Sequence, residues 1–178
     1  GCGADALELN IYNVSSDAKD SANEVERRLL NLVVAIRSAI KIPLSIKLVP
    51  FYSALPNLAR RIADEGADGL VLFNRSYYPL VDVEDLTLTS LPELSGSWEL
   101  PLRLRWVGIL HGKVNASLSI TGGIHSVEDA VKSILAGADT IQLVSALLKH
   151  GPEYLKELIA GFDLWMTRRN FQSLDECR

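Results

Sequence analysis

The stretch SITGGIHSVEDAVKSILAGADTIQLVSA, from Ser119 to Ala146, places one helical pattern between two short apolar runs. Ser126 can cap the start of this helix, and Gly137 can end it with a left-handed turn. Between them the apolar residues recur at helical spacing, at Val127, Ala130, Val131, Ile134 and Leu135. The stretch therefore predicts a strand, a helix and a second strand, which is the repeating unit of parallel α/β folds.

The tripeptide Gly-Ala-Asp that follows this helix occurs three times, beginning at Gly3, Gly66 and Gly137. Each copy leads directly into an apolar run: ALELNIY, GLVLFN or TIQLVSA. Two further strands are expected between the copies, PLSIKLV over Pro43 to Val49 and ASLSITGG over Ala116 to Gly123. With helical patterns between the strands, the chain predicts five consecutive strand-helix units.

The alternation of apolar and polar residues along the strands indicates whether these units form an open sheet or a barrel. In PLSIKLV the apolar residues Leu44, Ile46 and Leu48 alternate with Ser45 and Lys47, and ALELNIY and ASLSITGG divide in the same way. If helices cover the apolar face, a barrel interior that leads to a polar site explains the polar face. An open doubly wound parallel sheet is the alternative.

We therefore predict an α/β fold of the (βα)8 TIM barrel type, present as a partial barrel with strands four to eight and their helices. Such barrels typically have about 250 residues, so the first three strands are expected on a preceding segment. Residues 1–178 would be the C-terminal part of a single barrel domain. Residues 75–103, with a short strand at Leu86 to Ser90, break the pattern and are interpreted as an active-site excursion, a decorated loop being the alternative.

Composition narrows the function classes. The 178 residues are 48% hydrophobic with a net charge of −4, which indicates one soluble domain without a basic surface for nucleic acid. Arg103 and Arg105 are interpreted as a solvated helix face. The apolar runs are too short to cross a membrane. Cys2 and Cys177 have no disulfide or metal-ligand spacing, so we expect a cytoplasmic protein. The opening GCGADALELN shows no leader and is expected to lie within a longer protein.

Two glycine-containing turns predict an anion site. Gly122 and Gly123 end a strand, where their backbone amides can approach a phosphate at the start of the following helix. Ser145 and Ala146, after the next strand, can supply a second set of amides. A tight turn without a ligand also explains the glycine pair.

Lys47 lies within an apolar strand, where an ammonium needs a negative partner. One interpretation is a structural ion pair with Glu8 on the neighbouring strand. The other is a cation beside a cofactor that accumulates negative charge.

The ordered segments ALELNIYN, SIKLVPF, GLVLFN, LSG, ITGGIHSVEDAVKSILAGADTIQLVSALL and GPEYL resemble the successive motifs of the dihydroorotate dehydrogenase family. The resemblance covers nearly the whole chain. It implies an FMN-dependent barrel oxidoreductase of the CH-CH type in pyrimidine metabolism. It also implies that Asn10 and Lys47 contact the flavin and that Asn74 binds the substrate. The segments that align with the phosphate site contain Gly96, Gly122, Gly123, Ser145 and Ala146.

The chain departs from the family motif at the catalytic base. Asn13 stands where the family has a Cys or Ser, and a carboxamide cannot accept the substrate proton. Tyr12, Ser15 and Asp17 remain open as replacements, although Ser15 also replaces the last Asn of that motif. In addition, the family's Gly-Thr after strand eight reads Val144-Ser145. We therefore expect a dihydroorotate-dehydrogenase-like flavoprotein that acts on another small, planar or acidic substrate.

Two alternatives remain open at this stage. The chain could be a non-catalytic partial barrel that binds a phosphate ligand and forms a homo-oligomer through its open sheet edge or barrel rim. It could also be a sugar-phosphate barrel isomerase or synthase in which Lys47 forms a Schiff base. In the flavoenzyme interpretation the full-length protein is active and this chain alone is inactive.

The remaining histidines and tryptophans are assigned no chemistry. His111, His125 and His150 have no metal spacing. His125 is interpreted as a solvated loop residue, and a contribution to phosphate binding after the glycine pair is the alternative. The three tryptophans are attributed to packing.

Overall fold

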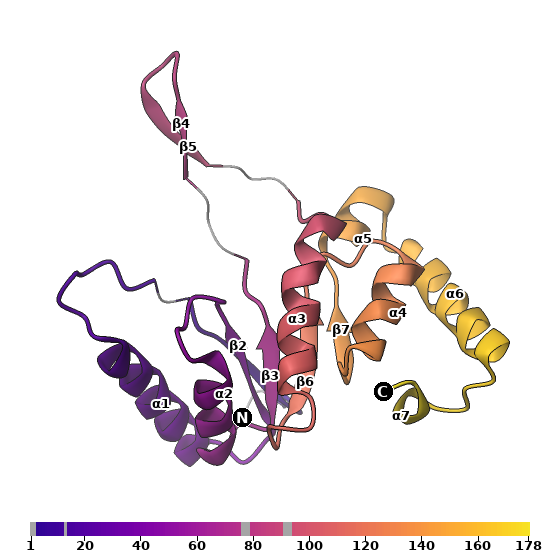
Figure 1. Cartoon of the computed structure of the whole chain (residues 1–178), viewed down its shortest axis with the longest axis horizontal. Helices are drawn as coiled ribbons and strands as arrows, with labels where there is room; N and C mark the ends of the chain where they lie inside the picture. The colour runs from indigo at the N-terminus through magenta and orange to yellow at the C-terminus, as the bar shows by residue number, and fades with distance from the viewer. Residues whose placement is uncertain (1–2, 13, 76–78, 91–93) are drawn as a thin grey trace.

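The computed structural model describes residues 3–12, 14–75, 79–90 and 94–178. Its centre is a five-stranded sheet in which all neighbouring strands run parallel, in the order β1-β2-β3-β6-β7 (Figure 1). The strand bounds are Leu7–Asn10, Leu44–Leu48, Gly69–Leu72, Ser117–Thr121 and Thr140–Gln142. The helices are α1 (Ala22–Ala39), α2 (Leu55–Asp64), α3 (Leu100–Leu110), α4 (Val127–Leu135), α5 (Ser145–His150), α6 (Tyr154–Arg169) and α7 (Leu174–Cys177), with a 3-10 turn, η1, at Ser97–Glu99.

The strand order distinguishes the two folds that the sequence left open. Each strand of the sheet pairs with the next parallel strand along the chain, and the order never reverses. A doubly wound sheet requires such a reversal, whereas a (βα)8 barrel has sequential neighbours. The chain is therefore part of a barrel, as predicted.

The sheet is also curved. Gln142 on β7 donates from Nε2 to Oε2 of Glu8 on β1 over 2.7 Å, although β1 and β7 lie at opposite ends of the sheet. Side chains on one face of a flat five-stranded sheet could not bridge its two ends, because neighbouring strands lie almost 5 Å apart. The polar side chains therefore face a concave interior.

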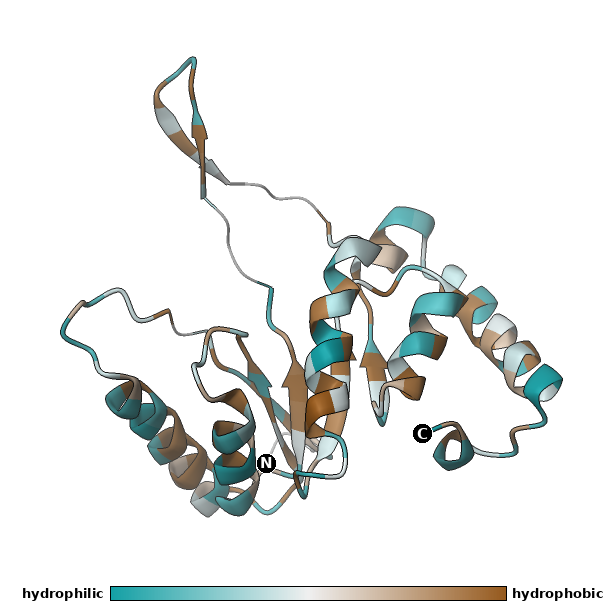
Figure 2. Cartoon of the chain, viewed as in Figure 1, coloured by the Kyte–Doolittle hydropathy of each residue, from teal (hydrophilic) through white to brown (hydrophobic). Residues whose placement is uncertain are grey.

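The apolar face of the sheet forms the core. Leu44, Ile46 and Leu48 on β2 are fully buried, as are Leu58 on α2 and Val107 on α3. Figure 2 shows the strands largely in brown, with teal residues along the exposed parts of α1 and α2. The helices α1, α2, α3 and α4 thus each contribute buried apolar residues to this core.

The Gly-Ala-Asp repeat has a structural explanation at the amino end of the sheet. Asp68 accepts a hydrogen bond at Oδ2 from the backbone N–H of Leu44 over 2.8 Å. Asp139 makes the equivalent contact with the N–H of Leu118 over 2.7 Å. The repeated aspartate therefore satisfies a backbone donor where the neighbouring strand begins.

The 75–103 excursion contains a hairpin of β4 (Pro79–Asp82) and β5 (Thr87–Ser90), which extends away from the rest of the molecule in Figure 1. The sequence predicted a strand at Leu86 to Ser90 and missed β4. The four residues of β4 have no clear pattern of their own, and pairing with β5 determines their extended form.

Within the described residues, none of the helices combines the length and apolar character needed to cross a membrane. The same part of the chain contains no cluster of side chains suited to a metal ion. Cys177 is a buried free thiol, and Cys2 lies outside the described residues.

Candidate functional site

A cavity of about 250 Å³ lies at the carboxyl ends of the strands. Lys47 from β2, Asn74 after β3, Gly122 after β6 and Ser145 after β7 all contribute to its lining. Barrel enzymes carry their active sites at this end of the sheet. Four of the residues singled out by sequence therefore meet at one place.

Lys47 lies on the concave face with only 18% of its side chain exposed. Its Nζ is 3.3 Å from Oε1 of Glu8, whose other oxygen accepts the hydrogen bond from Gln142. The ion pair expected from the sequence is present, and the same ammonium lines the cavity. The two interpretations of Lys47 are thus compatible, because Glu8 holds the cation where a ligand can meet it.

Asn10 and Asn74 join two strands that are not neighbours. Nδ2 of Asn74 donates to Oδ1 of Asn10 over 2.6 Å, across the end of the intervening β2. Oδ1 of Asn74 in turn accepts from the backbone N–H of Arg75 over 3.0 Å. These bonds fix the orientation of both carboxamides beside Lys47.

The two predicted anion-binding turns lie on the same rim and are joined by Ser95. The backbone N–H of Ser95 donates to Oγ of Ser145 over 3.0 Å, and Oγ of Ser95 accepts from the N–H of Gly123 over 3.5 Å. Ser95 is almost completely buried. This serine belongs to the LSG segment, and no sequence pattern had predicted a role for it.

The backbone conformation at positions 122 and 123 requires glycine. Gly122 and Gly123 both have φ of +82°, in the left-handed region that side chains disfavour. A Cβ on Gly123 would lie 2.7 Å from the backbone nitrogen of Leu100, at the start of α3. The second glycine therefore lets α3 pack directly against the turn.

The other predicted residues lie around this cavity without lining it. Asn10 is hydrogen-bonded to Asn74, which lines the cavity, but does not line it itself. Gly96 packs against the ring of Trp98, and Ala146 is buried behind Ser145. Asn13, at the family's base position, lies outside the described residues.

Arg103 does not lie on a solvated helix face, so the prediction from the sequence was wrong. Only 5% of the residue is exposed, and it lines the cavity. Its Nε donates to the carbonyl of Thr121 over 2.6 Å, and its Nη2 lies 3.1 Å from Oε2 of Glu99. The buried residues of α3 recur at positions 100, 103, 107 and 110, so helical spacing places this arginine on the core side. Arg105 is exposed, as expected.

The start of α4 is fixed by a buried carboxylate. Oδ2 of Asp129 accepts from Oγ of Ser97 over 2.8 Å and from the N–H of His125 over 3.0 Å. Burial alone would raise the pKa of Asp129, but these hydrogen bonds and those with Ser126 outweigh it and lower that pKa.

Two interpretations of aromatic residues in this region were wrong. His125 is half-buried rather than solvated, and burial together with the nearby Lys149 lowers its pKa, which keeps the ring neutral near pH 7. Trp98 is 75% exposed, so packing does not explain it.

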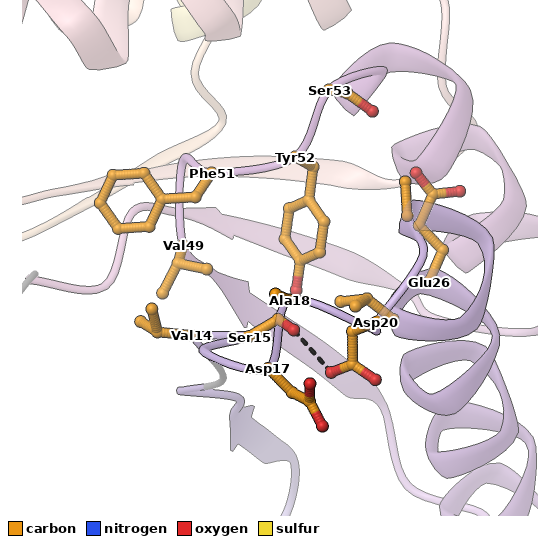
Figure 3. Close-up of a pocket in the computed structure, with 12 residues that line it drawn as sticks. Val14, Ser15, Asp17, Ala18, Asp20, Glu26, Val49, Phe51, Tyr52 and Ser53 are labelled. Atoms are coloured by element: carbon orange, nitrogen blue, oxygen red, sulfur yellow. Dashed lines mark hydrogen bonds between the residues drawn. The ribbon is translucent and has the colours of Figure 1, made fainter.

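A second cavity of about 320 Å³ lies beside the first two strand-helix loops. Figure 3 shows Tyr52 directed across it toward the segment that carries Ser15. Ser15 donates to Oδ2 of Asp20 over 2.6 Å, and hydrogen bonds from Arg28 and Ser15 lower the pKa of Asp20 to about 2. So acidic a carboxyl group is a weak base, and the Ser15–Asp20 pair is not an activated nucleophile or proton acceptor.

Comparison with known proteins fits this geometry. A sequence profile of the family described as dihydroorotate dehydrogenase matches residues 2–166. The chain belongs to the dihydroorotate dehydrogenase family. This membership accounts for the sequential parallel strands and for a site at their carboxyl ends.

Three curated relatives are described as "dihydroorotate dehydrogenase B (NAD(+)), catalytic subunit". The protein of Methanothermobacter thermautotrophicus is 27% identical, over 97% of this chain and 59% of its own length. That of Thermodesulfovibrio yellowstonii is 31% identical, over 98% and 58%. That of Bacteroides fragilis is 31% identical, over 96% and 57%. The chain thus spans less than two thirds of the length of these relatives.

Proposed function

We propose that the protein containing this chain is an FMN-dependent oxidoreductase of the CH-CH type. One observation carries the proposal: Lys47 and the two anion-binding turns, which are far apart in the sequence, line one cavity at the carboxyl ends of parallel strands. Family membership supports the same assignment.

The residues present fit a flavin mononucleotide. Gly122 and Ser145 offer a backbone amide and a hydroxyl for the phosphate, at the ends of two adjacent strands, while the N–H of Gly123 is donated to Ser95. Ser95 holds the two turns together, so the phosphate site is formed before a ligand arrives. Val144, where the family has Gly, is largely exposed and leaves these contacts intact.

The bound flavin would accept or supply the hydride, and the chain's own residues would hold it. Lys47 places an ammonium beside the ring, where positive charge stabilises the anionic reduced form. The carboxamides of Asn10 and Asn74, oriented by their mutual hydrogen bond, would position the flavin and the substrate respectively. The alternative in which Lys47 forms a Schiff base stays a prediction from the sequence.

The substrate in this proposal differs from dihydroorotate, because Asn13 cannot serve as the base. Among the three replacements considered, Ser15 is bound to a weakly basic carboxylate, and Asp17 accepts from the backbone of Lys19. Nothing in these contacts selects Asp17 or Tyr12 over the other. A small, planar or acidic substrate that needs a different proton acceptor fits the cavity best.

The visible spectrum of the intact protein tests the proposal. We expect a yellow protein that releases one FMN per chain on denaturation. Gly123→Ala should lower the flavin content more than Gly108→Ala, a control on α3 that does not line the cavity and whose new Cβ would make only an ordinary contact with the carbonyl of Ala136, at 3.8 Å. A colourless protein that does not take up added FMN would reject the proposal.

We also propose that the protein associates with a further chain. The relatives' printed description as catalytic subunits suggests a partner subunit, and the exposed Val81, Val83 and Leu88 of the hairpin offer an apolar surface. A homo-oligomer through the open edge of β1 or the barrel rim remains the prediction from the sequence. Light scattering that shows only a monomer would reject self-association. A cytoplasmic location also remains a prediction.

A further inference from the structure

A buried carboxylate beside the cavity has one unsatisfied oxygen. Glu99, the last residue of η1, lines the cavity, and its side chain is only 10% exposed. Its Oε2 accepts from Nη2 of Arg103 over 3.1 Å. Its Oε1 is buried and has no hydrogen-bond partner within the described residues. Because an ionised oxygen without a donor is costly to bury, this site requires a hydrogen-bond donor at Oε1.

The neighbouring elements do not supply that donor. Glu99 is the N-cap residue of α3, but its side chain makes no capping hydrogen bond with the helix. Nε of Arg75 lies 3.9 Å from Oε1, which is too far for a hydrogen bond, and 42% of the Arg75 side chain is exposed. An ion pair as long and exposed as this contributes little stability, so Arg75 can move aside for a ligand.

Arg103 holds the carboxylate in place. Besides the contact with Oε2, its Nη1 donates to the carbonyl of Glu99 over 2.8 Å. Its Nε donates to the carbonyl of Thr121, the residue before Gly122. Glu99 is thereby tied to the strand end that carries the first predicted phosphate-binding turn, and the guanidinium offsets its negative charge there.

The position of Glu99 indicates which donor it meets. On one side lies Arg75, which follows Asn74 at the end of β3, where we place the flavin ring and the substrate. On the other side lies Thr121, followed by Gly122, where we place the phosphate. In flavin mononucleotide a chain of hydroxyl-bearing carbons joins the ring to the phosphate. A hydroxyl that donates to a carboxylate forms a short and strong hydrogen bond.

We propose that Oε1 of Glu99 accepts a hydrogen bond from a hydroxyl of this polyol chain, and that Glu99 thereby selects flavins that carry it. The inference rests on the proposed function and adds a specificity-determining residue to it. Arg103 is a positioning residue in this arrangement, because it acts on the ligand only through Glu99.

The test compares FMN with an analogue in which an unsubstituted pentyl chain joins the same ring to the same phosphate. Binding of each flavin to the intact protein, freed of flavin and without substrate, is followed by flavin fluorescence and by calorimetry. We expect FMN to bind at least about tenfold more tightly, as one hydrogen bond to a charged group allows. Equal affinities would overturn the inference, because Oε1 would then be satisfied by another donor, such as water, Arg75 or the substrate.

Two substitutions assign the preference to Glu99. Glu99→Met should remove most of it, because a thioether is a poor acceptor, and Glu99→Gln should reduce it several-fold through loss of the charge. Loss of a negative charge near the phosphate affects both flavins alike, so the ratio of their affinities isolates the hydroxyl contact. Glu128→Gln, at an exposed position on α4, is the matched control and should keep the full preference.

The outcomes separate this inference from the proposed function. If Glu99→Met fails to fold, Glu99→Gln still decides, because glutamine preserves the volume of the side chain and an acceptor for Arg103. Failure of the wild type to bind either flavin rejects the proposed function. Normal FMN binding with a preference that Glu99→Gln leaves unchanged rejects only the role of Glu99.

Discussion

The two ends of the parallel sheet differ in how they use their residues. At the amino end, Asp68 and Asp139 make the same contact with the backbone of a neighbouring strand, and each follows the same Gly-Ala pair. At the carboxyl end, no loop repeats another, and Lys47, Arg75 and Glu99 gather around one cavity. Repeated residues thus stabilise this fold, whereas the residues to which we assign chemistry are unrepeated.

The largest expected effect comes from Gly123→Ala at the carboxyl end. The new Cβ would meet the backbone of Leu100 and force a side chain into left-handed backbone, at a cost of about 3 kcal/mol in the free energy of unfolding. Gly122→Ala should cost less, because its Cβ would meet only the end of the Arg103 side chain, at 3.0 Å. Urea denaturation of both variants measures the difference, and equal losses would contradict this account.

At the amino end, Asp139→Ala should destabilise the protein by about 2 kcal/mol, because the N–H of Leu118 loses its side-chain acceptor. Flavin affinity should not change, since the substitution is at the opposite end of the sheet. Asp163→Ala on α6 is an exposed control with little expected effect. A loss of flavin affinity in Asp139→Ala, with stability unaltered, would break the distinction between the two ends.

Lys47→Met should have the opposite pattern to Asp139→Ala: it should change the properties of the bound flavin and leave the fold intact. Removal of the ammonium should lower the reduction potential of the bound flavin by roughly 30 to 60 mV, or about 1.4 to 2.8 kcal/mol for a two-electron couple. The fold should survive, because Glu8 keeps its hydrogen bond from Gln142. Potentiometry in the presence of a reference dye measures the shift. An unchanged potential would place Lys47 among the structural residues.

The smallest expected effect is the pH dependence contributed by Asp129. Because its pKa is lower in the folded protein, its stabilising contribution is present above the unfolded pKa of about 4 and is lost as the pH falls through the folded pKa. Asp129→Asn should therefore be less acid-sensitive than the wild type as the pH falls below about 4. Thermal unfolding across this range measures the slope, and parallel curves would argue against the assignment.

Much of this arrangement was predictable. Alternation of polar and apolar residues in β2 placed Lys47 on the concave face, and the glycine pair marked the end of β6. Arg103 was misassigned because two arginines separated by one residue were taken as an exposed pair, whereas the period of α3 buries only the first. Ser95 gave no signal, since a lone serine is common in loops.

The sequence by itself determined the five strand-helix units, the face of each strand and the positions of the turns, because these depend on local periodicity and backbone preference. Only the tertiary structure brought Gln142 to Glu8, Asn74 to Asn10, and Ser95 to both of the predicted anion-binding turns. These contacts join residues that are distant in the chain. They form only when the curvature of the sheet and the packing of α3 bring the strand ends together, which no local pattern encodes.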